Sequence, residues 1–271
     1  MTERLDKFIS AQTCYTRTDI RKLLWKRKIS VDGKILRDGE IKIDPEKAEV
    51  IVDGRKIIYR DKVYIILNKP EGYVCATEDK REKTVMELLG EDIRRKDLFP
   101  SGRLDKDTLG MVLITNDGPL SHRILSPKKH IPKYYIVKLA DKFQKSYIEV
   151  FKNGVEIDGG ERCLPAKVKC FPEYENIAFI ELFEGKFHQV KRMFTAVENN
   201  VEKLVRIQMG GLVIPEKLGL GEYMEILHKD VENLLKTPDF DEVFVLPDTQ
   251  NQKMRHAKKE KRPFKRRKNP P

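Results

Sequence analysis

The chain has 271 residues, of which 39% are hydrophobic and 36% are charged, and it carries a formal net charge of +11. This length accommodates two domains, and the hydrophobic fraction suffices for a core, which excludes a wholly disordered protein. No stretch approaches the ~18 consecutive apolar residues of a membrane span, and the charged first residues lack the apolar region of a secretion signal. We therefore expect a cytoplasmic protein without a membrane partner.

The positive charge is concentrated at the two ends of the chain. Residues 1–60 contain 15 Lys and Arg against 10 Asp and Glu, residues 61–245 contain 29 against 31, and residues 246–271 contain 10 against 2. A nearly neutral central segment between two basic terminal segments suggests that the terminal segments bind a polyanionic partner and that the central segment carries the chemistry. Residues 246–271 have a composition that predicts a disordered tail, which either binds that partner or is simply a solvated basic segment.

The four cysteines give no sign of a metal site or a disulfide framework. Cys14, Cys75, Cys163 and Cys170 form no CxxC pair, and no grouping of His and Cys has the spacing of zinc ligands. Reduced thiols in a cytoplasmic protein are the simplest interpretation. We therefore expect no structural metal.

The N-terminal residues predict a small unit of helices and short strands. Apolar residues recur at helical spacing in Leu5–Ile9, and a second amphipathic run at Arg17–Arg27 has Thr16 or Thr18 as its cap. Short strands separated by Asp-Gly turns are expected at Ile29–Val31, Lys34–Leu36, Ile41–Ile43 and Val50–Val52.

A longer unit begins near Lys62 and mixes strands and helices without regular alternation. Apolar runs predict strands at Val63–Leu67, Met111–Thr115, Tyr134–Leu139 and Ala178–Phe183. Helices are expected at Val85–Leu89, between Pro119 and Pro127, and at Phe187–Val197. This order of elements favours an α+β fold over a doubly wound one.

One polar segment, Gly102–Gly110, is bounded by glycines and leads directly into a buried strand. Such loops present side chains to a cleft from a rigid support. Arg103 and Asp105 are two residues apart, so in an extended stretch their side chains point to the same side. A surface turn with a solvated ion pair is the alternative. A metal site at Asp105 and Asp107 has little support, because no third ligand lies nearby.

A second segment, Glu184–Met193, predicts a helix with one basic face. His188 and Lys191 lie three residues apart on that face, whereas Val190 and Phe194 lie on the opposite one. A stripe of His and Lys suits an RNA backbone, or a catalytic carboxylate that needs a cationic partner. On the pattern alone, an ordinary amphipathic helix with a solvated face is favoured.

The third segment, Leu67–Tyr73, is a strand followed by a turn rich in Pro and Gly. Lys69 within it either contacts a phosphate or faces water. Each of the three segments is weak evidence by itself, and their order and spacing along the chain carry the stronger signal.

Together these segments resemble the bacterial ribosomal RNA pseudouridine synthases that have an N-terminal S4 domain. The resemblance extends from residue 2 to about residue 245. It implies an α+β protein with a small S4-type RNA-binding domain at 1–60 and a catalytic domain at 61–245, in which helices flank a mixed, largely antiparallel sheet. The basic tail at 246–271 matches nothing in the family.

The resemblance also assigns roles to particular residues. Asn-Lys-Pro around Lys69 matches the first motif of the family, and the Gly-Arg-Leu-Asp that ends at Asp105 matches the loop of the catalytic aspartate. Lys-x-Tyr places the active-site tyrosine at Tyr135, His-Gln-Val-Lys places the partner of the aspartate at Lys191, and a downstream pattern includes Arg206. The catalytic set is thus Asp105, Tyr135 and Lys191. The expected RNA contacts are Arg103, Lys69, His188, Lys186, Arg192, Arg206, Arg4, Arg17, Arg21 and Lys22.

The implied reaction is the isomerisation of one uridine to pseudouridine, which requires no cofactor because nothing is oxidised or transferred to another molecule. The aspartate acts at C1′ of the sugar or C6 of the base, or through a glycal intermediate, and these routes stay open. The target base must leave its stack, and Arg103 is expected to intercalate or hold the opened RNA. The expected partner is ribosomal RNA within an assembly intermediate, bound by a monomer.

The residues at two positions bear on the choice of substrate, and a third position departs from the family pattern. His188 and Lys191 resemble the small-subunit (16S) rRNA uridine synthase branch, whereas large-subunit branches tend to have Arg at both positions. Lys186 stands where the family often has Arg. The alternatives are a large-subunit 23S rRNA synthase and a non-catalytic S4-type RNA-binding ribosome-assembly factor. A metal-dependent nuclease is a distant third, because clustered carboxylates and histidines are lacking.

Overall fold

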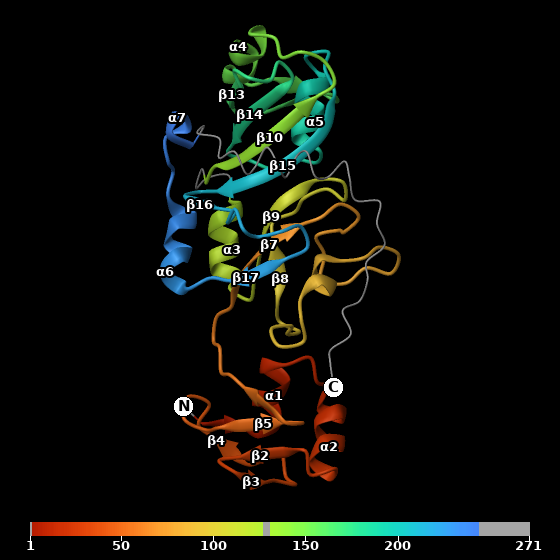
Figure 1. Cartoon of the computed structure of the whole chain (residues 1–271), viewed down its shortest axis with the longest axis vertical. Coiled ribbons are helices and arrows are strands. Elements are labelled where there is room, and N and C mark those ends of the chain that lie inside the picture. The colour runs from red at the N-terminus through yellow and green to blue at the C-terminus, as the bar shows by residue number, and fades with distance from the viewer. Residues whose placement is uncertain (1, 127–130, 244–271) are drawn as a thin grey trace.

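The computed structural model describes residues 2–126 and 131–243, which form a small N-terminal unit and a larger unit (Figure 1). In the N-terminal unit, helices α1 (Leu5–Gln12) and α2 (Arg17–Trp25) pack beside a four-stranded antiparallel sheet. The strands of this unit are β3 (Lys34–Ile35), β2 (Ile29–Val31), β5 (Val50–Val52) and β6 (Arg55–Ile57) in sheet order, with β1 (Glu3–Arg4) paired to β4 (Lys42–Ile43).

The second helix begins at a reciprocal pair of hydrogen bonds. The Thr16 hydroxyl accepts one from the backbone N–H of Asp19 at 3.1 Å, and the Asp19 carboxylate accepts one from the backbone N–H of Thr16 at 2.9 Å. Two N–H groups that a helix start leaves without partners are thereby satisfied, so Thr16 rather than Thr18 is the cap. The helix buries Ile20 and Leu24 in the core of this unit and leaves its basic side in solvent.

The larger unit is built around a mixed sheet that has nine strands within the described residues. The main path is β13 (Lys167–Cys170), β14 (Ile177–Leu182), β10 (Lys133–Leu139), β15 (Val201–Met209), β9 (Leu109–Thr115), β7 (Tyr64–Lys69) and β17 (Tyr223–Glu225). The side branches are β16 (Leu212–Val213) on β15 and β8 (Phe99–Ser101) on β9. The predicted α+β class is confirmed.

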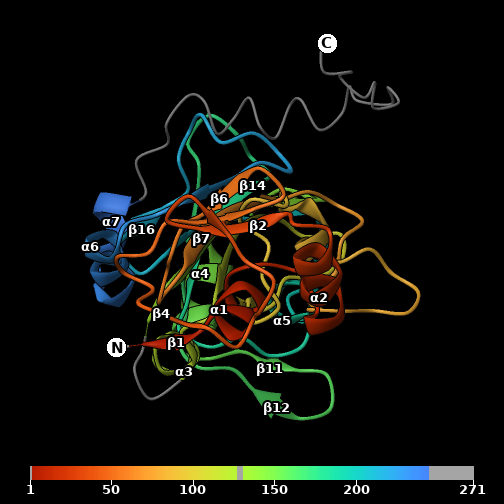
Figure 2. The same ribbon diagram turned by 90° about the horizontal axis from the view of Figure 1, so that it is seen from below.

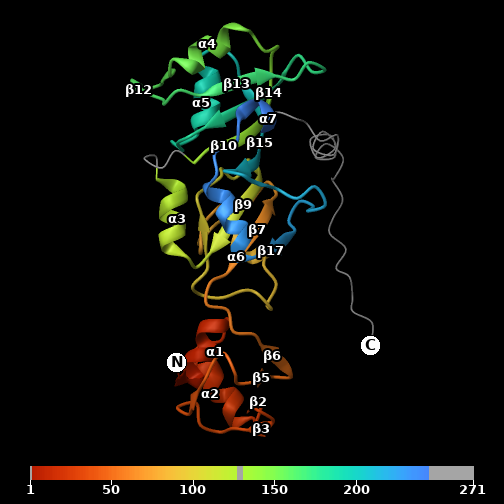
Figure 3. The ribbon, with the colours of Figure 1, turned by 90° about the vertical axis from the view of Figure 1, so that its left-hand side faces the viewer.

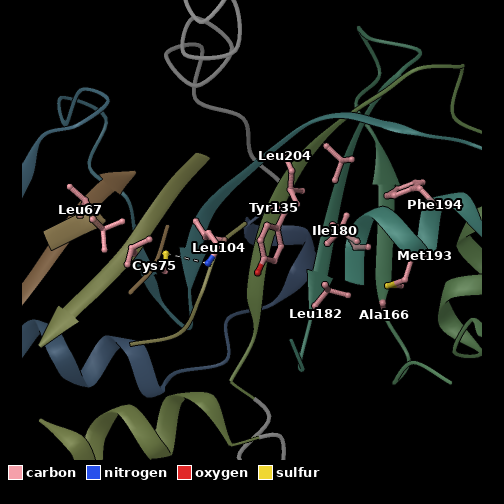
Figure 4. Packing of buried hydrophobic residues seen from close by; sticks show 14 of the residues in the cluster. Leu67, Cys75, Leu104, Tyr135, Ala166, Ile180, Leu182, Met193, Phe194 and Leu204 are labelled. Carbon is pink, nitrogen blue, oxygen red and sulfur yellow. Dashed lines mark hydrogen bonds between the residues drawn. The ribbon is translucent and has the colours of Figure 1, made fainter. Parts of the chain in front are cut away.

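Helices cover both faces of this sheet (Figure 3). On one face, α4 (Ser146–Lys152) and α5 (Gln189–Thr195) share a hydrophobic cluster with the sheet, part of which Figure 4 shows. On the other face, α3 (Gly118–Leu125) and α6 (His228–Val231) share a second cluster. The remaining elements are a hairpin of β11 (Glu156–Ile157) and β12 (Glu161–Arg162), α7 (Phe240–Val243), and 3-10 helices at Val85–Leu88 and Glu232–Leu235. Across residues 2–126 and 131–243, no helix is long and apolar enough to cross a membrane.

A parallel contact between β9 and β15 joins two antiparallel halves of the sheet, which Figure 1 shows one above the other. Leu109 pairs with Val205, and Gly110 pairs with Arg206. Gly110 has a φ of +101°, and a Cβ atom added to it would lie 2.2 Å from the carbonyl oxygen of Arg206. Only glycine therefore allows the two strands to approach this closely.

A buried arginine ties the N-terminal unit to the larger one. The Arg95 guanidinium donates to the side-chain oxygen of Gln12 at 3.0 Å and to the carbonyl oxygen of Arg60 at 2.6 Å, and it forms an ion pair with Asp97 at 2.6 Å. Arg60 lies in the segment that connects β6 with β7. The connection between the units is thus fixed by hydrogen bonds to a charged group, which are stronger than neutral ones.

One predicted element is wrong in a way that matters for the site. The helix expected at Phe187–Val197 spans only Gln189–Thr195, because His188 has a left-handed backbone with a φ of 50° and the helix starts after it. Phe187, an apolar residue at the start of the expected helix, is 75% exposed. Most of the other predicted bounds differ by one or two residues, and the tail at 246–271 lies outside the described residues.

Replacing Gly110 with alanine should destabilise the larger unit, since the new Cβ meets the Arg206 backbone and the φ disfavours a side chain. We expect the free energy of unfolding to fall by about 3 kcal/mol, measured by urea denaturation with circular dichroism. Gly118→Ala is the matched control, because a Cβ at Gly118 meets nothing within 4 Å. Equal stability of the two variants would contradict the close-approach argument.

Candidate active site

The loop between β8 and β9 carries Asp105 over one face of the sheet. Leu104 is buried in the cluster beneath it, and the Leu104 N–H donates to the Cys75 sulfur at 3.3 Å (Figure 4). The Thr108 N–H donates to the Asp105 carbonyl oxygen at 3.1 Å and closes a tight turn. These anchors fix the backbone on both sides of Asp105 and leave 26% of its side chain exposed.

Lys69 is fully buried and holds this loop in place. Its Nζ donates to the carbonyl oxygens of Pro70 at 3.1 Å, Lys106 at 3.1 Å and Thr108 at 2.8 Å. Burial lowers the pKa of Lys69 to about 8. All three N–H bonds of the ammonium are used inside the protein, so the prediction that Lys69 contacts RNA is wrong.

Two cationic or titratable side chains from the start of α5 meet the Asp105 carboxylate. Lys191 Nζ lies 3.2 Å from Oδ2 of Asp105, and His188 Nε2 lies 3.5 Å from Oδ1. Lys191 Nζ also donates to both carboxylate oxygens of Asp107, at 2.7 and 2.9 Å. Lys191 therefore lies between two carboxylates of the same loop, and the sequence did not predict its bond to Asp107.

Burial and hydrogen bonding have opposing effects on the pKa of Lys191 and on the pKa of Asp107. Partial burial lowers the pKa of Lys191, but hydrogen bonds from Lys191 to Asp107 and Asp105 outweigh burial and leave that pKa above its ordinary value. Burial raises the pKa of Asp107, but the hydrogen bond and the charge of Lys191 outweigh it, so this pKa is lowered. The ammonium of Lys191 and the carboxylate of Asp107 are thus both charged at neutral pH.

The backbone before α5 aims His188 at the carboxylate. His188 has φ 50° and ψ 31°, a left-handed conformation that costs a non-glycine residue roughly 1–2 kcal/mol. The buried Gln189 side chain fixes the segment, since it accepts from the Lys186 N–H at 2.9 Å and donates to Glu184 at 2.8 Å. Strained residues of this kind persist where the surroundings hold them, and they cluster at functional sites.

The two adjacent tyrosines of β10 face opposite sides of the sheet. Tyr135 belongs to the same apolar cluster as Leu104, and Figure 4 shows its ring beside that residue. Tyr134 belongs to the other cluster, stacks on Phe179 at 5.8 Å between ring centroids and donates its hydroxyl to the Pro238 carbonyl oxygen. Only Tyr135 is therefore on the face that carries the Asp105 loop.

Arg206 is buried in the sheet and not on the surface, so the prediction that it contacts RNA is wrong. Its Nε donates to the carbonyl oxygen of Met111 at 2.8 Å, and one terminal nitrogen has no hydrogen-bond partner in the described part of the chain. Lys133 is buried as well, and burial, followed by the charge of Arg206, lowers the pKa of Lys133 to about 8. These cations belong to the scaffold around the β9–β15 contact.

Lys186 and Arg192, also expected to contact RNA, are paired with acidic residues of the β11–β12 hairpin, which projects from the larger unit in Figure 2. Lys186 lies 2.9 Å and Arg192 3.1 Å from Glu161, and Arg192 also pairs with Asp158. Arg103, in contrast, is exposed and makes no ion pair within residues 2–126 and 131–243. Of the three, Arg103 has the charge most available to a ligand.

The residues of the N-terminal unit that were predicted to contact RNA are far in sequence from Asp105, His188 and Lys191. Arg17, Arg21 and Lys22 are exposed on α2, whereas Arg4 is bound by acidic neighbours. Arg4 and Arg21 line a cleft of about 670 Å³ together with Trp25, which is 84% exposed. The prediction overlooked Trp25, although a lone tryptophan within a basic helix is a signal that the sequence contains.

The geometry provides a carboxylate, a charged lysine, an imidazole and an aromatic ring on one face of the sheet. Among the described residues, no group of three or more His, Cys, Asp or Glu is arranged to hold a metal ion. Such an arrangement can attack or stabilise an electron-poor carbon and can hold a planar ring.

Comparisons with known proteins find similar chains among the RNA pseudouridine synthases. Residues 63–196 match the family described as RNA pseudouridylate synthase. An uncharacterized RNA pseudouridine synthase of Bacillus subtilis is 40% identical over 87% of the chain and 99% of its own length. Ribosomal small subunit pseudouridine synthase A of Escherichia coli is 37% identical over 86% of the chain and its whole length. A crystal structure of a pseudouridylate synthase is 35% identical, with a TM-score of 0.60 over 86% of the chain and 99% of its own.

The buried Lys69 should make stability depend on pH. Its pKa in the folded state, about 8, is below its ordinary value of 10.5, so the unfolded chain binds more protons between these values and stability rises with pH across this window. We expect the free energy of unfolding of the wild type, relative to Lys69→Met, to increase from pH 8 to pH 10 in urea titrations. Lys106→Met, which removes an exposed lysine from the same loop, is the control. A pH-independent difference would contradict this assignment.

Proposed function

Because the chain belongs to the RNA pseudouridylate synthase family, we propose that it isomerises one uridine of small-subunit (16S) ribosomal RNA to pseudouridine, with Asp105 as the catalytic residue. The observation that carries this proposal is the Asp105 carboxylate paired with Lys191 at 3.2 Å in a loop fixed on both sides. The small-subunit target is supported by the names of relatives that are 37–40% identical over nearly their whole length, in Escherichia coli and Vibrio parahaemolyticus.

The reaction breaks the N1–C1′ bond, turns the uracil, and joins C5 to C1′, while C5 loses a proton and N1 gains one, each exchanged with solvent or a protein group. Asp105 attacks C1′ or C6, or acts through a glycal, and in each route an anionic carboxylate must lie beside the nucleoside. Lys191 holds that carboxylate by a charged hydrogen bond and is itself kept in place by Asp107. The Tyr135 ring supports the uracil by stacking, which keeps the base close while it is detached.

The RNA must be opened before this chemistry, since a stacked uridine cannot reach Asp105. Arg103 is suited to hold the opened strand because its guanidinium is exposed two residues from the carboxylate. The N-terminal unit, an S4-like RNA-binding domain at 1–60, adds affinity through Arg17, Arg21 and Lys22. The enzyme acts as a monomer on an assembly intermediate in the cytoplasm, and residues 61–245 form its catalytic domain.

Mapping pseudouridine in unmodified ribosomal RNA tests the reaction and the catalytic residue together. We expect the wild type to form pseudouridine at one small-subunit position, Asp105→Asn to form none, and Lys191→Met to lower kcat by about 10²-fold through loss of electrostatic support. Lys106→Met, in the same loop but paired with Glu82, should retain activity. If wild type and variants bound RNA tightly but made no pseudouridine, a non-catalytic assembly factor would be the better assignment.

The RNA-binding role of α2 has its own test. Replacing Arg17 and Arg21 by Gln should weaken binding to small-subunit RNA and reduce the slope of log Kd against log salt by about two, because two phosphate contacts are lost. Trp25 fluorescence provides a direct readout of binding at this face, since the chain has one tryptophan. Lys56→Gln, on β6, is the control. An unchanged salt slope in the double variant would place the phosphate contacts elsewhere.

A further inference from the structure

Phe187 is a large apolar side chain held in solvent at the edge of the active site. It is 75% exposed, and it belongs to none of the hydrophobic clusters of the described residues. Helical periodicity would place it inward with Val190 and Phe194, and the left-handed backbone at His188 turns it outward instead. An exposed aromatic ring that breaks the pattern of its own segment calls for a functional explanation.

The backbone that carries this ring is rigid. The Phe187 carbonyl oxygen accepts from Arg192 Nη1 at 3.1 Å, and the Gln189 N–H donates to the Lys186 carbonyl oxygen at 3.2 Å. Arg192 is in turn fixed by Asp158. The ring is therefore presented on a fixed support, which lowers the entropy that a ligand must overcome on binding.

One face of the Phe187 ring is covered and the neighbouring groups lead directly to the catalytic carboxylate. The imidazole of His188 stacks on it, with 3.8 Å between ring centroids and 17° between ring planes. His188 Nε2 lies 3.5 Å from Oδ1 of Asp105. A planar ligand on the open face of Phe187 would thus be separated from the Asp105 carboxylate by the stacked rings of Phe187 and His188.

We propose that Phe187 is a stacking platform for the nucleobase adjacent to the target uridine. When a uridine turns out of the RNA, its neighbours lose a stacking partner, and an aromatic side chain replaces that partner for any of the four bases. A phenylalanine ring has only two rotatable bonds and its π-face suits stacking. The inference rests on the proposed function, because it assumes that RNA carries a uridine to Asp105.

Kinetics on unmodified small-subunit RNA provide the first test. Phe187→Ala should lower kcat/KM by about tenfold, equal to about 1.4 kcal/mol of binding in the transition state. Phe187→Tyr, which keeps an aromatic ring, should stay within about twofold of the wild type, and an unchanged circular dichroism melting curve of Phe187→Ala shows that its loss is not caused by misfolding. Leu227→Ala is the matched control, since Leu227 is 62% exposed and precedes α6 on the opposite face of the sheet. Wild-type kcat/KM in Phe187→Ala would overturn the proposal.

Direct binding separates this inference from the proposed reaction. The probes are two oligoribonucleotides with one uridine each, with 2-aminopurine on its 5′ side in one and on its 3′ side in the other. In an Asp105→Asn background, Phe187 should quench the fluorescence of one probe on binding, and Phe187→Ala should abolish that quenching while RNA is still bound. Equal quenching by both proteins would overturn the platform. If quenching is equal but the protein with Asp105 intact still forms pseudouridine, the proposed function stands and only the stacking role of Phe187 is lost.

Discussion

The parallel pairing of β9 with β15 at Gly110 is the constraint on which the active site depends. This pairing joins two antiparallel halves of the sheet, and the residues gathered at the site come from both of them. Asp105 enters from the loop before β9, whereas Tyr135 lies on β10 and Lys191 on the helix that precedes β15. The carboxylate and the ammonium meet only because the absence of a side chain at residue 110 lets the halves approach at this register.

Buried cations secure the backbone around the same contact. Lys69 donates to three carbonyl oxygens, Lys133 to that of Ile131, and Arg206 to that of Met111. A buried charge is tolerated when its hydrogen-bonding capacity is met. Carbonyl groups of loops and strand ends meet it for Lys69, and they meet part of it for Arg206, one terminal nitrogen of which has no partner among the described residues. The motif segments therefore combine Asp105 and Lys191, which meet at the site, with Lys69 and Arg206, which hold the backbone around it in place.

Sequence patterns predicted the fold class, most strands, and the loop and helix that carry Asp105 and Lys191, because these depend on local periodicity and on motif spacing. They did not show that Lys69 and Arg206 are buried, since a lysine or arginine looks the same in a sequence whether it meets phosphate or carbonyl oxygens. The outward turn of Phe187 was equally hidden, because it follows from the left-handed backbone of one residue, His188, and hydrogen bonds of Gln189 and Arg192 hold the segment around it.

The bridge from Lys191 to both Asp105 and Asp107 has a consequence for what can enter the site. The two carboxylates are offset by Lys191 and by the buried Lys69 that holds the same loop, so the centre carries little net charge, whereas Arg103 provides exposed positive charge at the margin. A polyanion is therefore drawn to the margin, while an uncharged ring enters the centre without an electrostatic barrier. This distribution of charge orients a polyanion with its backbone outside and one neutral base inside.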